Sequence, residues 1–164
     1  MGIVFNAEEI LEIAEQIERN GQNFYKKAAE NTSEERHKKL LTDLYEMEVE
    51  HEKTFANMKA KLEPKERESR DMDPENQGAA YLRAVADGHV FEYKRDPSLE
   101  LTGKESIEEI LNTALGMEKE SVVFYTGIKD MVPERLGSNR ISDIIKEELS
   151  HITLLSKHIV NLKS

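Results

Sequence analysis

The residues best suited to chemistry form two copies of the pattern Glu-x-x-His, Glu48 with His51 and Glu148 with His151. Residues three apart share one face of an α-helix, so each pair can direct a carboxylate and an imidazole into the same small volume. Divalent iron and manganese accept both kinds of ligand. Each pair therefore predicts half of a metal site, provided that both pairs lie on helices.

Two further glutamates, Glu18 and Glu118, lie a hundred residues apart and complete the predicted set. Four carboxylates balance the four positive charges of two divalent ions. Without cations, four carboxylates in a helical core would lose hydration and repel one another. The predicted metal ligands are Glu18, Glu48, His51, Glu118, Glu148 and His151.

Tyr25 and Tyr125 each follow one of these glutamates by seven residues. A phenol two turns from a ligand glutamate can hydrogen-bond a ligand carboxylate on another helix, and we favour this role over simple packing. The two tyrosines are therefore predicted to support the site without binding the metal directly.

The two halves of the chain superpose without a gap at an offset of one hundred residues. Glu18 lies roughly 20 Å before the turn between the first two predicted helices, and Glu48 roughly 22 Å after it, at about 1.5 Å per residue. The six side chains are therefore expected at one level. The repeat also includes Ile10-Leu11, Ala14, Phe24-Tyr25 and Asp43, which recur as Ile110-Leu111, Ala114, Phe124-Tyr125 and Asp143.

Apolar residues at helical spacing predict an all-α fold, an antiparallel four-helix bundle formed by one domain over residues 1–164. Two helical hairpins, about 6–62 and 104–162, are joined by one long crossover, 63–103, between the second and third helices. The crossover is predicted to contain a short helix, Ala79 to Asp87, and a helix start at Asp73-Pro74-Glu75. The predicted helix starts are Asn6, the capping boxes Thr32 with Glu35 and Ser106 with Glu109, and Ser138.

Composition narrows the class of function. The net charge of −10 disfavours binding to nucleic acid or to an anionic membrane surface. The absence of cysteine excludes disulfides, thiolate zinc sites and iron–sulfur clusters. No apolar run approaches the ~20 residues of a membrane span, and the first residues do not resemble a signal peptide. A cytoplasmic protein is the expectation.

The Glu-x-x-His pattern occurs a third time, as Glu34 with His37. The positions a hundred residues later hold no histidine, so this copy is interpreted as a solvated first turn of the second helix. His158 is interpreted as a capping or core histidine, and His89 as at most a distant neighbour of the site. For the two inner copies the alternative is buried, hydrogen-bonded polar groups without metal.

With these residues in place, the sequence resembles the rubrerythrins, a family of the ferritin-like di-iron carboxylate superfamily. The resemblance rests on Ala14-x-x-x-Glu18, Gly21, Phe24-Tyr25, the spacing to Glu48-x-x-His51 and the long crossover. It implies two iron ions, with manganese possible, at the six predicted ligands. It also implies that the protein reduces peroxide or reacts with dioxygen and takes electrons from an external donor.

The chain departs from the family pattern at two points. Rubrerythrins usually carry a rubredoxin-like module with four cysteines, and this sequence has none. They also carry a glutamate one turn after the ligand on the third helix, where Ser121 stands. Two other functions therefore stay open: iron binding or sequestration without turnover, and a scaffold for partner interaction. The long crossover permits helix exchange, and a homodimer is expected.

Overall fold

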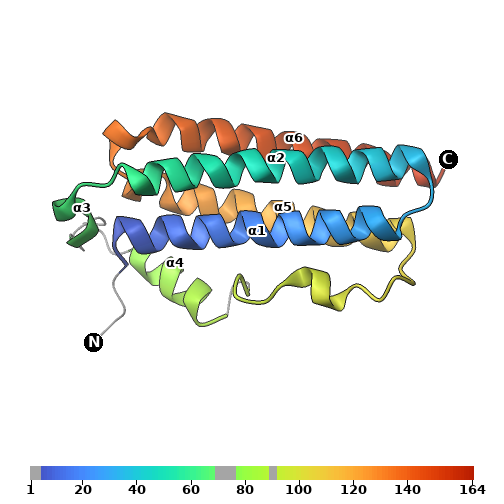
Figure 1. The fold of residues 1–164 in the computed structure, drawn as a ribbon, viewed down its shortest axis with the longest axis horizontal. Coiled ribbons are helices and arrows are strands. Elements are labelled where there is room, and N and C mark those ends of the chain that lie inside the picture. Colours follow the sequence, from blue (N-terminus) through green and yellow to red (C-terminus); the bar gives the residue numbers. More distant parts are fainter. Residues whose placement is uncertain (1–4, 69–76, 89–91) are drawn as a thin grey trace.

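Four long helices lie side by side along the length of the molecule (Figure 1). They are α1 (Ala7–Asn31), α2 (Glu35–Ala60), α5 (Ile107–Ile128) and α6 (Ser138–Leu162). The computed structural model describes residues 5–68, 77–88 and 92–164. In these ranges α1 packs against α2, α5 packs against α6, and α1 also contacts α5. The predicted all-α four-helix bundle is confirmed.

The crossover exists because α2 and α5 run in the same direction (Figure 1). After the 26 residues of α2 the chain must return the full length of the bundle, about 39 Å at 1.5 Å per residue. The described parts of this connection include α3 (Pro64–Glu68), α4 (Gln77–Ala86) and the 3₁₀ helix η1 (Pro97–Glu100). Helix α4 is the predicted short helix, begun two residues earlier, and Gly88 follows it with a φ of +74°.

Two of the predicted helix starts are confirmed in detail. The Asn6 side chain accepts from the Glu9 amide at 2.9 Å, and the Glu9 carboxylate accepts from the Asn6 amide at the same distance. Ser106 and Glu109 form the equivalent capping box at the start of α5, with distances of 3.2 and 2.7 Å. Each box satisfies two backbone amides that the first helical turn leaves without partners.

The predicted capping box of Thr32 with Glu35 is wrong. Residue 34 is the N-cap of α2, and no side chain caps it. The Thr32 hydroxyl instead donates to the carbonyl of Ala28 at 2.7 Å, in the last turn of α1. The hydroxyl therefore completes the preceding helix and does not begin the next one.

The predicted cap at Ser138 is also wrong. Gly137 is the N-cap of α6, with a φ of +95°, and Ser138 is already the first helical residue. Two short 3₁₀ helices, η2 (Lys129–Met131) and η3 (Glu134–Leu136), connect α5 to this point. Gly137 ends η3 in a left-handed conformation that glycine adopts without steric cost. The same residue is therefore the C-cap of η3 and the N-cap of α6.

The core is divided into two apolar clusters. One cluster lies toward the start of α1 and includes Ile10, Leu11, Phe55, Phe124 and Ile141. The other lies toward the end of α1 and includes Phe24, Leu41, Leu44, Leu111 and Leu155. In sequence, the six predicted ligands fall between these clusters on every long helix.

The outer faces of the bundle carry charged pairs one turn apart, such as Lys39 with Asp43 at 2.6 Å and Lys53 with Glu50 at 2.7 Å. Exposed pairs of this kind contribute about 0.3–0.5 kcal/mol each. Across residues 5–68, 77–88 and 92–164, no helix combines the length and apolar character that crossing a bilayer requires. The predicted helix start at Asp73-Pro74-Glu75 lies outside these ranges, and so does His89.

The two serines at helix starts offer a direct test. Replacing Ser106 with alanine is expected to lower the free energy of unfolding by about 1 kcal/mol, because a capping hydrogen bond is lost. Ser138→Ala is expected to change it by less than about 0.5 kcal/mol, because its side chain caps nothing. Urea unfolding followed by circular dichroism measures both. Equal losses in the two variants would contradict the assigned caps.

Candidate metal centre

The six predicted ligands converge in the middle of the bundle. Helix α1 contributes Glu18, α2 contributes Glu48 and His51, α5 contributes Glu118, and α6 contributes Glu148 and His151. Each of these residues is at most 5% exposed. All six side chains lie on the inward faces of the four helices. On each helix they lie between the two apolar core clusters, and this places them at one level of the bundle.

The ligand atoms form two overlapping groups. Glu18 and His51 belong to the first group, and Glu118 and His151 belong to the second. Glu48 and Glu148 belong to both. In each group one oxygen or nitrogen from every residue lies within 4.8 Å of all the others, so each group can surround one ion.

Both imidazoles turn the same nitrogen toward the carboxylates. His51 Nδ1 lies 2.9 Å from Glu148 Oε1 and 3.5 Å from Glu18 Oε2. His151 Nδ1 lies 3.0 Å from Glu148 Oε2 and 3.4 Å from Glu118 Oε2. The two rings stack with centroids 5.9 Å apart. The Nε2 atoms are therefore left to point away from the cluster.

Three buried atoms of the cluster have no hydrogen-bond partner in the described structure: Glu18 Oε2, His51 Nδ1 and Glu148 Oε1. A buried polar atom without a partner costs about 1–3 kcal/mol. All three belong to the first group of ligand atoms and face one another. An oxygen-rich, nitrogen-containing set of this kind fits a divalent transition-metal ion.

Gly21 makes room for the Glu48 carboxylate. A Cβ atom at position 21 would lie 3.1 Å from the carboxylate carbon and from one of its oxygens. Such a contact is too close for a carboxylate held between four helices. The glycine on the inward face of α1 therefore allows Glu48 to lie in the centre of the cluster.

The two tyrosines connect the hairpins through the cluster. The Tyr25 hydroxyl on α1 donates to Glu118 on α5, and the Tyr125 hydroxyl on α5 donates to Glu18 on α1. Both rings are almost completely buried. Each bond occupies one oxygen of a carboxylate and leaves the other oxygen facing the cluster.

The carboxyl groups of the cluster have strongly shifted pKa values. Burial, with repulsion from neighbouring carboxylates, raises the pKa of Glu48 well above its usual value and that of Glu118 to about 8. Burial likewise raises the pKa of Glu18. Burial also opposes ionisation of Glu148, but its close polar contacts with Glu118 and with both imidazoles outweigh this effect and lower its pKa. Glu148 is therefore the carboxylate that stays charged.

The imidazoles act as counter-ions to these carboxylates. Burial favours neutral rings, but the close contact with the Glu148 carboxylate and its charge raise the pKa of His51 to about 9. For His151 the same opposing effect of burial is outweighed by Glu118 and Glu148, which raise its pKa to about 10. In the metal-free protein, protons on the imidazoles and carboxyl groups offset the negative charge of the cluster. A metal ion would have to displace these protons.

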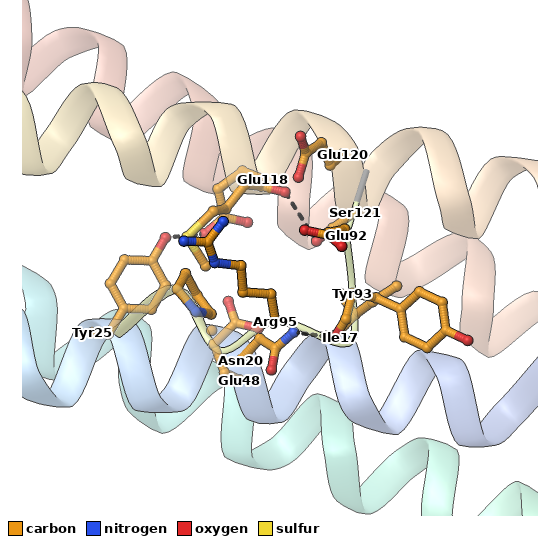
Figure 2. A pocket seen from close by; sticks show the side chains of 13 residues that line it. Ile17, Asn20, Tyr25, Glu48, Glu92, Tyr93, Arg95, Glu118, Glu120 and Ser121 are labelled. Carbon is orange, nitrogen blue, oxygen red and sulfur yellow. Dashed lines mark hydrogen bonds between the residues drawn. The ribbon is translucent and has the colours of Figure 1, made fainter. Parts of the chain in front are cut away.

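A cavity of about 80 Å³ reaches the cluster between α1 and α5 (Figure 2). Its inner wall includes Glu48, Glu118 and Tyr25. Residues 92–97 of the crossover cover it, and the Asn20 side chain holds this cover by donating to the Tyr93 carbonyl at 2.6 Å. This volume accommodates a few molecules of the size of water.

Several residues near the cluster were not found from the sequence. No spacing relates Asn20 to Tyr93, because the contact spans 73 residues and depends on how the crossover folds back. Glu147 and Met47, which contact the outward nitrogens of the imidazoles, were also missed. Comparing the residues that precede the two ligand glutamates in the repeat would have drawn attention to this last pair.

The third Glu-x-x-His copy is not solvated as predicted. His37 is 3% exposed, and its Nε2 lies 3.1 Å from a Glu34 oxygen. The imidazole turns inward because position 37 is one turn before Leu40 and Leu41 on the buried face of α2. His158 is only partly buried, and its Nδ1 lies 3.1 Å from the Leu154 carbonyl. Neither histidine belongs to the groups of potential ligands described above.

The fold and the buried cluster together define a class, the ferritin-like four-helix bundle with carboxylates and imidazoles in its core. A sequence model of the rubrerythrin family matches residues 9–159, and the chain belongs to the rubrerythrin family. Among solved structures, a candidate ferritin-like diiron-carboxylate protein from Thermotoga maritima is similar to it. That structure aligns over 97% of each chain, with a TM-score of 0.71 and 20% sequence identity. No curated protein matches the sequence.

The metal-free protein is expected to lose stability as the pH rises from about 5 to about 9. The pKa values of Glu118, His51 and His151 in the folded chain, about 8, 9 and 10, lie above their ordinary values. The folded state therefore keeps protons that the unfolded chain has released, and the free energy of unfolding falls with pH. Thermal unfolding of chelator-treated protein measures this slope.

A Glu118→Gln variant provides the control, because it removes the carboxyl group with a pKa of about 8 while keeping the shape of the side chain. The fall in melting temperature between pH 5 and 8 is expected to become shallower in this variant. A melting temperature that rises over this range in the metal-free protein would contradict the protonated cluster.

Proposed function

We propose that the protein binds two iron ions in this cluster and reduces peroxide or dioxygen. The observation that carries the proposal is the pair of overlapping ligand groups, each with two shared carboxylates, one further glutamate and one imidazole. Glu18, Glu48, His51 and Glu148 would hold one ion, and Glu48, Glu118, Glu148 and His151 would hold the other. Membership of the rubrerythrin family and the fold of the candidate diiron-carboxylate protein support the same reading.

The bound ions would supply two electrons, the number that converts hydrogen peroxide and two protons to two water molecules. The residues of the chain would provide the surroundings for this reaction. The two apolar clusters limit access of bulk water to the centre from both directions along the bundle. Tyr25 and Tyr125 hold a proton at each phenol oxygen and direct it to a ligand carboxylate, which fixes the orientation of Glu118 and Glu18.

The cavity beside α1 and α5 would be the approach for the substrate. Its lining includes Glu48 and Glu118 and, among the described residues, neither His51 nor His151, so a small molecule would reach the ions from the carboxylate side. Its volume of about 80 Å³ suits peroxide or dioxygen better than a bulky organic hydroperoxide. A separate electron donor would return the electrons to the ions.

Iron binding without turnover is the second candidate, and Ser121 favours it. The position that carries an additional glutamate in most rubrerythrins holds a half-buried serine here, and its hydroxyl donates to the Met117 carbonyl at 3.2 Å. The serine lines the cavity but offers no carboxylate to an ion. The two candidates differ in whether peroxide oxidises the loaded protein rapidly.

Two glutamates on α2 provide a matched test. Glu48 lies in both ligand groups, whereas Glu50 is exposed and pairs with Lys53. Glu48→Gln is expected to reduce iron content from two ions per chain to one or none, and to slow oxidation by peroxide at least about tenfold. Glu50→Gln is expected to leave both unchanged. Metal analysis and anaerobic stopped-flow absorption measure the two effects.

If the wild-type protein binds two ferrous ions but peroxide oxidises them no faster than free Fe(II), the second candidate is correct. If the wild-type protein binds fewer than about one ion per chain after reconstitution, both candidates fail. The Glu48→Gln variant is suited to this comparison because removing one of four crowded carboxylates relieves repulsion in the metal-free fold.

A further inference from the structure

The two imidazoles of the cluster differ in what their outward nitrogens contact. His51 Nε2 lies 2.6 Å from Glu147 Oε2. His151 Nε2 lies 3.3 Å from the sulfur of Met47. One ring is therefore paired with a carboxylate and the other with a thioether, although their inward nitrogens face similar carboxylates.

This difference breaks the internal repeat at one pair of positions. Met47 and Glu147 each precede the glutamate of a Glu-x-x-His motif and lie a hundred residues apart. Each also contacts the imidazole of the opposite hairpin, Glu147 on α6 reaching His51 on α2, and Met47 on α2 reaching His151 on α6. The two contacts are therefore structural equivalents with different chemistry.

A carboxylate and a thioether act differently on an imidazole. A carboxylate accepts strongly from Nε2–H, which fixes the ring, leaves the Nδ1 lone pair for a metal and makes that nitrogen a stronger donor. A thioether sulfur is a weak acceptor, so it neither fixes the ring firmly nor strengthens Nδ1 as a donor to the same extent. The Glu147 carboxylate is itself held from outside, since its other oxygen lies 3.5 Å from the Arg140 guanidinium.

We propose that Glu147 is a positioning residue that makes the half-site of His51 the tighter of the two, so that the centre fills in sequence. The first ion occupies the group that contains Glu18 and His51, and the second occupies the group that contains Glu118 and His151. This inference rests on the proposed two-metal centre and adds an order of loading to it.

Both positions suit substitution. The Glu147 side chain is 37% exposed, and Met47 is 36% exposed, so neither is needed to fill the core. Replacing Glu147 with methionine gives both rings a thioether, and replacing Met47 with glutamate gives both rings a carboxylate. Asp143→Asn is the matched control, because it removes an acidic charge from the exposed face of the same helix, one turn earlier.

The experiment is an anaerobic titration of chelator-treated protein with Co(II), followed by its visible absorption. Wild-type protein is expected to bind two ions in separate steps, the first roughly 10–100-fold tighter. Glu147→Met is expected to weaken the first step by a similar factor and merge the two. Met47→Glu is expected to strengthen the second step, and Asp143→Asn to change neither.

Proton NMR of the Zn(II)-loaded protein gives a second readout that does not depend on affinity. The Nε2–H proton of His51, bonded to a carboxylate, is expected downfield of the equivalent proton of His151. The difference is expected to disappear in Glu147→Met. A role for Glu147 in the fold alone would not move this signal selectively.

Two equal Co(II) sites in the wild-type protein would overturn the inference and leave the two-metal centre standing. So would a Glu147→Met variant with an unchanged first step. A wild-type protein that binds neither Co(II) nor Zn(II) would overturn the metal centre itself and the order of loading with it.

Discussion

The burial of four carboxyl groups close together is the constraint on which the rest of this structure depends. Burial alone would force these groups to keep their protons, and it raises the pKa values of Glu18, Glu48 and Glu118. Two imidazolium rings and two phenols offset the repulsion in the metal-free chain. Two divalent cations would offset it more completely, because they neutralise all four charges at once. A bundle core without ligands would use leucine at these positions.

The same interactions join the two hairpins. Both apolar clusters include residues from all four long helices. The polar contacts of the metal-ligand cluster also pass between the hairpins: Tyr25 to Glu118, Tyr125 to Glu18, and His51 to Glu147 and Glu148. Docking of the hairpins therefore brings the six polar side chains together. The parallel direction of α2 and α5 places the crossover along the bundle, where residues 92–97 cover the cavity beside the cluster.

Helical spacing made the bundle and the convergence of its six polar side chains predictable. Glu48 and His51 share a face at any position on a helix, and the gap-free repeat implied that Glu148 and His151 do the same. Which of several neighbouring residues caps a helix was not predictable. Thr32 and Ser138 were both predicted as N-caps, but Thr32 bonds to the preceding helix and Ser138 lies inside α6. Contacts between distant segments, such as Asn20 with Tyr93 and Glu147 with His51, follow from how helices dock and leave no periodic signal.

The proposed function requires that two ions bind at the groups that share Glu48 and Glu148 and bring the buried acidic side chains close to neutrality. Anomalous diffraction at the iron edge from crystals grown anaerobically with Fe(II) tests this most directly. Two peaks are expected inside the bundle, one beside His51 and one beside His151, with the two shared carboxylates between them. An absence of peaks within the bundle, or iron bound only at acidic groups on its surface, would contradict the claim.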